Sequence, residues 1–115
     1  MSGRIHKSRI PIMRSVNLPP DIREQLIQAK QGVAAGINRV PFSNQRGGPG
    51  DGPPLPGLQN GSEYIECQIG NSRPGDPRPA GKKRVVFEVH AASRRILESY
   101  YTEEHYSKFS FWRLV

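Results

Sequence analysis

The sequence predicts an α+β fold, in which an N-terminal helix packs on a chiefly antiparallel, twisted β-sheet. One early stretch has helical periodicity, four later runs have the composition of strands, and segments rich in Gly and Pro separate them. A chain of 115 residues is long enough for one modest hydrophobic core. We therefore expect a single domain over residues 17–115, preceded by a basic segment, residues 1–16, that forms an arm or an edge strand.

The helix is predicted to begin at the sequence NLPPD, residues 17–21. Proline is favoured in the first turn of a helix, and an aspartate there lies near the positive end of the helix dipole. Ile22, Leu26, Ala29 and Val33 follow at spacings that place them on one helix face. This apolar stripe needs a sheet to cover.

The strands are predicted at residues 64–69, 84–90, 95–101 and 105–112. Before the first of them, residues 43–61 contain ten Gly or Pro in nineteen positions. A connection of this length is either a functional loop or a disordered one. A second loop rich in Pro and Gly, residues 70–81, carries Arg73 and Arg78.

The composition favours a polyanionic partner. Seventeen Lys and Arg against ten Asp and Glu give a formal charge of +7, which suits nucleic acid first and an anionic membrane surface second. Cys67 is the only cysteine, so neither an intramolecular disulfide nor a thiolate metal site can form, and its alternation with Glu66 predicts a buried thiol on the opposite side of the sheet. No His, Asp and Glu cluster has metal-ligand spacing, so we expect no metal and no cofactor.

Neither a membrane span nor a secretory signal is expected. Every apolar run is shorter than the roughly 18 residues that a span requires. The basic residues near the N-terminus also interrupt its short apolar runs, which removes the apolar region of a signal peptide. We expect the chain to act without inserting into a membrane.

Glu66, Arg84 and His105 are the candidate catalytic residues, each set in a strand-forming run. Together they could cleave RNA without a metal. The carboxylate would take the proton from a ribose 2′-OH, the guanidinium would stabilise charge on the phosphate, and the imidazolium would protonate the departing 5′-oxygen. Such an acid–base pair predicts a bell-shaped dependence of the rate on pH.

The chain resembles the microbial guanyl-specific ribonucleases, the family of barnase. The likeness covers roughly residues 17–112. It is carried by the order of the elements and by six motifs: LPP at residues 18–20, VPFSN at 40–44, LPG at 55–57, EYIE at 63–66, RVVF at 84–87 and TEEHYSKF at 102–109. The resemblance implies the microbial ribonuclease fold and cleavage of single-stranded RNA 3′ of guanosine, through a 2′,3′-cyclic phosphate.

The resemblance also assigns roles to residues. Glu66 would be the general base, His105 the general acid and Arg84 the phosphate-binding residue. The remaining substrate-binding positions would be Phe42 against guanine, the backbone around Ser43, Asn44 and Gln45, Tyr106 in the pocket, and Arg78, Lys82 or Lys83 as a second cation. The chain departs from the family where a glutamate normally reads guanine, because Gln45 and the two residues after it stand there; Asp51 is the only acid in that loop.

We expect a monomeric toxin or effector domain, secreted or delivered by other machinery, with an acidic protein inhibitor in the producing cell. Two other functions remain open. The altered guanine loop fits a ribonuclease-like protein that binds RNA without cutting it. Charge alone fits a basic protein that binds DNA or a membrane surface.

Overall fold

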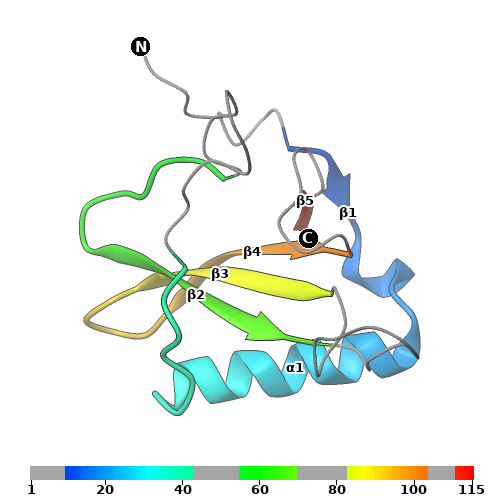
Figure 1. Cartoon of the computed structure of the whole chain (residues 1–115), viewed down its shortest axis with the longest axis horizontal. Coiled ribbons are helices and arrows are strands. Elements are labelled where there is room, and N and C mark those ends of the chain that lie inside the picture. The colour runs from blue at the N-terminus through cyan, green and yellow to red at the C-terminus, as the bar shows by residue number, and fades with distance from the viewer. Residues whose placement is uncertain (1–9, 43–54, 70–82, 104–110) are drawn as a thin grey trace, which may run out of the picture.

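One face of a five-stranded β-sheet is covered by a long helix in the computed structural model (Figure 1). The structure describes residues 10–42, 55–69, 83–103 and 111–115. Its elements are β1 (Ile12–Met13), the 3-10 helix η2 (Ser15–Asn17), α1 (Pro20–Ala34), β2 (Ser62–Gln68), β3 (Arg84–His90), β4 (Ile96–Thr102) and β5 (Phe111–Leu114). The strand order is β1-β5-β4-β3-β2, and every pair is antiparallel except β1 with β5. The predicted α+β class is confirmed.

Helix α1 begins where the sequence predicts. Pro19 is the N-cap, and Pro20 and Asp21 occupy the first turn, where a missing N–H costs nothing and a carboxylate is favoured. The end is set by Gly36, whose φ of +75° suits a residue without a Cβ. The N–H groups of Ile37 and Asn38 then donate to the carbonyl of Gly32.

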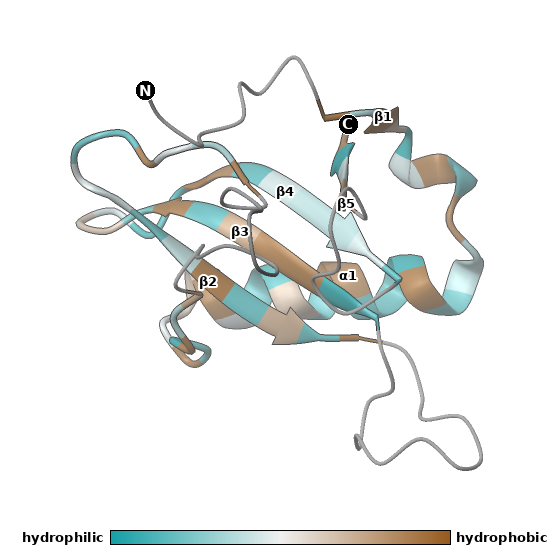
Figure 2. Ribbon diagram, turned by 45° about the horizontal axis from the view of Figure 1, so that its top comes forward, coloured by the Kyte–Doolittle hydropathy of each residue, from teal (hydrophilic) through white to brown (hydrophobic). Residues whose placement is uncertain are grey.

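The sheet has two different faces because side chains alternate along each strand. The face toward α1 holds the larger core, to which the helix contributes Ile22, Leu26 and Val33. Figure 2 shows the corresponding alternation of hydrophobic and hydrophilic bands along the ribbons. We call the opposite side the distal face; a smaller buried cluster there consists of Ile10, Leu55, Tyr64, Val86, Tyr100 and Phe111.

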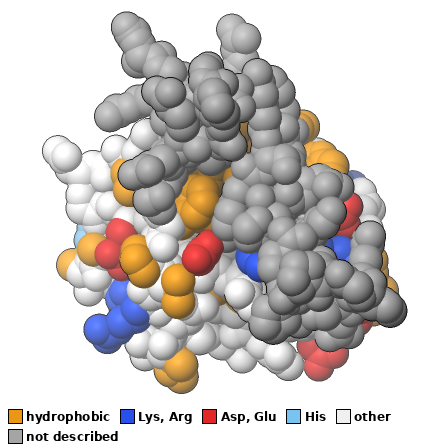
Figure 3. All heavy atoms as spheres, viewed as in Figure 1, with side chains coloured by type: hydrophobic (Ala, Val, Ile, Leu, Met, Phe, Trp, Pro, Cys, Tyr) orange, Lys and Arg blue, Asp and Glu red, His pale blue; other side chains and the backbone are white. Residues whose placement is uncertain are grey.

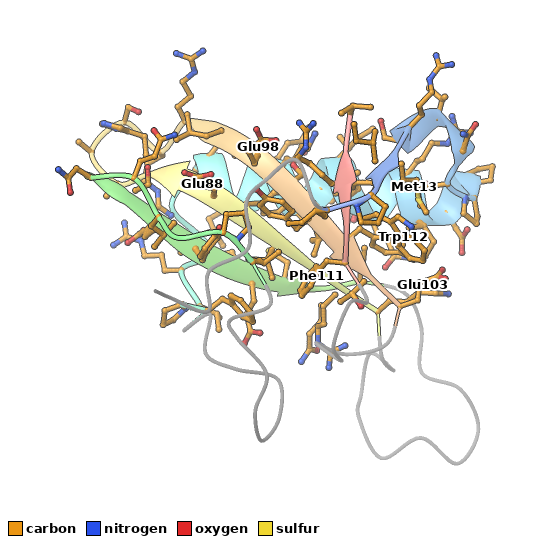
Figure 4. All side chains as sticks on the ribbon, turned by 90° about the horizontal axis from the view of Figure 1, so that it is seen from above. Met13, Glu88, Glu98, Glu103, Phe111 and Trp112 are labelled. Atoms are coloured by element: carbon orange, nitrogen blue, oxygen red, sulfur yellow. The ribbon has the colours of Figure 1, made fainter. Side chains whose placement is uncertain are left out.

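The edges of the sheet were the least predictable part. Of residues 1–16, those from 10 onward are described, and Ile12 and Met13 form an edge strand parallel to β5. Trp112 lies on the helix side, where it stacks on Tyr101 with ring centroids 6.2 Å apart. Figure 4 shows Trp112 near Met13, which packs against the same core. β5 also continues to Leu114, beyond the predicted end of that strand.

In the described part of the chain, no helix combines the length and hydropathy needed to cross a membrane.

Candidate active site

Glu66 and Arg84 lie on the distal face of the sheet, on neighbouring strands. Glu66 pairs with Val86 across β2 and β3, and Arg84 pairs with Gln68, two positions away on each strand. The two candidate residues are therefore diagonal neighbours, with Cα atoms separated by about 7–8 Å, a spacing that long side chains bridge. The structure thus brings together two members of the predicted trio.

Arg84 is held in a fixed position although it carries a charge. Its side chain is only 3% exposed. Nη1 donates to the carbonyl of Lys83 at 2.8 Å, and its neighbours across the sheet are Gln68 on β2 and the fully buried Thr102 on β4. A guanidinium held in this way keeps the planar set of donors that suits phosphate oxygens in a fixed orientation.

The segment that follows α1 is tied to β2 beside Glu66. The N–H of Glu66 donates to the carbonyl of Val40 at 2.8 Å, and the N–H of Phe42 donates to the carbonyl of Tyr64 at 3.0 Å. Pro41 forms the bridge between them with Ile65. The start of the motif that resembles a guanine-recognition loop therefore lies next to the proposed base.

Phe42 packs into the distal cluster. Its ring makes edge contacts with Tyr64 and Phe111, with centroids 6.1 and 6.4 Å apart. At the other end of the loop, Leu55 is fully buried and the hydroxyl of Tyr64 donates to the carbonyl of Pro56 at 2.7 Å. The two described residues that flank positions 43–54, Phe42 and Leu55, therefore both pack on the distal face.

A pair of carboxylates on the same face was missed in the sequence. Glu88 and Glu98 are direct cross-strand partners on β3 and β4, as Figure 4 shows. Glu98 pairs with Arg113 at 3.5 Å, and Glu88 is only 5% exposed. Glu88 has the same strand parity as Arg84, so alternation alone could have placed it on this face.

Two tyrosines accompany this acidic pair. Tyr64 and Tyr100 are both buried, with ring centroids 6.2 Å apart. Burial is the main cause that raises the pKa of each phenol above its ordinary value, and the charges of Glu88 and Glu98 raise it further. The two phenols therefore stay protonated to a higher pH than an exposed tyrosine would.

Arg94 is a structural residue that the sequence did not reveal. It adopts a left-handed backbone conformation, with φ of 64°, in the turn between β3 and β4. Its guanidinium donates to the carbonyls of Val33 (3.2 and 3.3 Å) and Asn38 (3.3 Å) and pairs with Glu63 at 3.2 Å. One side chain thus joins the end of α1, the segment leading to Glu66, and β2.

Cys67 faces the helix side, opposite Glu66, as its parity predicts. It is 5% exposed, and its Sγ accepts a hydrogen bond from Asn38 Nδ2 at 2.7 Å. Burial, with a smaller effect of Glu66, raises the pKa of the thiol to about 12. The residue is therefore a neutral buried thiol rather than a nucleophile.

Several predicted residues lie outside the described part of the chain: Ser43, Asn44, Gln45, Arg78, Lys82, His105 and Tyr106. Lys83 immediately precedes β3, and its parity is opposite to that of Arg84, so alternation does not bring it to the distal face. Among the described residues, no group of three or more His, Cys, Asp or Glu is arranged to hold a metal ion.

Comparison of the chain with protein-family models, curated proteins and solved structures found no match in any of the three.

Proposed function

We propose that the chain is a metal-independent endoribonuclease that cleaves single-stranded RNA 3′ of guanosine. The observation that carries the proposal is the shared position of Glu66 and Arg84 on the distal face. A carboxylate that accepts a proton and a buried guanidinium that binds the phosphate are two of the three parts that the reaction needs.

The positions of the strand ends next to Arg84 favour His105 as the third catalytic residue. Thr102, the cross-strand partner of Arg84, also pairs with Phe111 at the start of β5. His105 follows Thr102 by three residues, a length of chain that spans at most about 11 Å. This length of chain therefore allows an imidazole at position 105 to reach a phosphate bound at Arg84.

In this mechanism Glu66 takes the proton of the guanosine 2′-OH, and the 2′-oxygen attacks the adjacent phosphorus. The bond from phosphorus to the 5′-oxygen breaks while His105 protonates that oxygen. The products are a 2′,3′-cyclic phosphate and a free 5′-hydroxyl. Arg84 stabilises the charge that develops on the phosphate oxygens.

The guanine preference rests on the loop anchored beside Glu66. Phe42 at its start and Leu55 at its end both belong to the distal cluster, so the base of a nucleotide whose ribose lies at Glu66 would be next to this loop.

Digestion of a defined RNA in EDTA, with the cut sites and termini mapped, tests the proposal. We expect cuts after guanosine and cyclic phosphate ends, whereas a requirement for a divalent ion or cutting of an all-deoxy strand would reject it.

A toxin or effector role with an acidic inhibitor is the biological setting we propose for this activity, because a chain with a formal charge of +7 suits an acidic partner. Harmless expression of the active chain in ordinary bacteria without an inhibitor would count against that role and leave the chemistry untouched.

A further inference from the structure

A hollow of about 400 Å³ lies at the outer edge of β2, beside Glu66. We call it the edge hollow; its lining residues are Ile37, Asn38, Arg39, Val40, Glu66, Cys67 and Gln68. Its volume is within the range of about 300–1,000 Å³ that is typical of small-molecule sites. A smaller hollow against α1 shares Asn38, Cys67 and Gln68 with it, so the two adjoin.

The hollow exists because the chain leaves the edge of β2 after pairing with it. Val40 is hydrogen-bonded to Glu66, but Asn38 is turned toward the helix, where its N–H donates to Gly32. The side chain of Asn38 is also fixed, since Nδ2 donates to Cys67 and Oδ1 accepts from the N–H of Val40 at 3.2 Å. The wall of the hollow is therefore preformed.

The lining, which holds one guanidinium and one carboxylate, can take a planar, neutral group whose attached anion lies at the guanidinium. Ile37 and Val40 are 82% and 51% exposed and offer apolar surface. Gln68 provides an exposed amide with both a donor and an acceptor, and the alternation along β2 directs its backbone N–H toward the same edge. Arg39 is the cation of the lining.

In the described part of the face seen in Figure 3, exposed hydrophobic side chains lie among acidic and basic ones. Together with the formal charge of +7, this mixed surface fits a nucleotide better than an apolar protein segment. A base can lie on the aliphatic side chains and hydrogen-bond to the amide, while its phosphate is attracted to the guanidinium.

The direction of the reaction decides which nucleotide reaches the hollow. In an in-line displacement, the attacking and leaving oxygens lie on opposite sides of the phosphorus. With Glu66 on β2 and the proposed acid after β4, the leaving 3′ part of the RNA extends across β3 toward β4. The 5′ part extends the opposite way, over the outer edge of β2.

We propose that the edge hollow binds the nucleotide immediately 5′ of the cleaved guanosine. This inference rests on the proposed function, because it uses Glu66 as the base that marks the position of the reacting ribose.

The test compares GpU, the 5′-extended UpGpU and the 3′-extended GpUpU. We expect the 5′ extension to raise kcat/KM by about tenfold in the unmodified protein, as one added set of base contacts would. Arg39→Ala and Gln68→Ala should each reduce this gain to about threefold or less. Arg14→Ala, which removes the same charge at the opposite edge of the sheet, should retain it.

A second measurement separates this inference from the proposed function. Binding of dGpU and UpdGpU, which lack the reactive 2′-OH at the guanosine, reports the contribution of the extra nucleotide without any cleavage. If the unmodified protein binds UpdGpU more tightly than dGpU and both variants lose this difference, the result would support nucleotide binding in the edge hollow even if no RNA were cut. An equal gain in the variants and the unmodified protein, or a gain from the 3′ extension alone, would overturn it.

Discussion

Replacement of Arg94 by alanine is expected to destabilise the fold by about 2–3 kcal/mol. The side chain is 20% exposed and donates to two carbonyls, those of Val33 and Asn38. Hydrogen bonds from a charged donor contribute about 1.5–3 kcal/mol each at good geometry, and distances of 3.2–3.3 Å favour the lower end of that range.

Two smaller contributions add to the stability that Arg94→Ala is expected to lose. A cation at the C-terminal end of a helix adds about 0.3–1 kcal/mol. The ion pair with Glu63 adds less than about 1 kcal/mol, because that carboxylate is 43% exposed and screened by solvent. Since these contributions share one side chain, they do not add fully.

The assay is urea unfolding followed by circular dichroism, with thermal unfolding as a check. For a domain of this size, a loss of 2–3 kcal/mol should lower Tm by about 8–12 °C. Arg94→Gly is the matched variant, because it removes the same contacts but relieves the positive φ of 64°. It should be about 1 kcal/mol more stable than Arg94→Ala.

Arg95→Ala provides the control, since its side chain is exposed in the same turn; we expect a change within about 0.5 kcal/mol. A loss below about 0.5 kcal/mol in Arg94→Ala, or a glycine variant less stable than the alanine variant, would refute the view that this guanidinium joins α1, β2 and the intervening segment.

Three further predictions concern titration and catalysis. Because the pKa of the Cys67 thiol is raised to about 12, only about one thiol in ten thousand is ionised at pH 8; alkylation should be slow in the native protein and fast in urea, and rapid native labelling would contradict the burial. The pKa values of Tyr64, Tyr100 and Tyr101 are raised by burial above the ordinary 10.0, so the folded state keeps these protons when the unfolded state loses them. Their contribution to stability is complete below pH 10 and falls as the pH rises above it. The tyrosinate absorbance of these three residues should therefore appear together with unfolding, and three tyrosines that ionise near pH 10 in the folded protein would disagree. Arg84→Lys keeps the charge but loses the planar donor pair, so the rate of RNA cleavage should fall by about 10²–10³, while a rate within threefold of the unmodified protein would mean that the guanidinium has no special role.

Local signals were sufficient for the helix and for most of the sheet. The prolines and aspartate at residues 19–21, with an apolar stripe, define α1. Alternation along residues 63–69 and 84–90 sets the strands and places Glu66 and Arg84 on one face. These features depend on spacing within a segment, which a sequence displays directly.

The features that were missed depend on contacts between distant segments. Arg94 contacts Val33 across 61 positions of sequence, and the residues adjacent to Arg94 in the sequence do not indicate that contact. The pairing of Val40 and Phe42 with β2 and the parallel pairing of β1 with β5 likewise arise from the tertiary fold. Short edge segments carry too few residues for a periodic signal, so their partners cannot be predicted from pattern alone.

The central claim is tested most directly by comparing the unmodified protein with Glu66→Gln and His105→Gln on one guanosine-containing RNA in EDTA. We predict that the unmodified protein releases a 2′,3′-cyclic phosphate and that each substitution lowers the rate at neutral pH by at least about 10². Both variants should stay folded by circular dichroism. Two folded variants that cut at the original rate would contradict the assignment of base and acid, and an inert unmodified protein would contradict the ribonuclease itself.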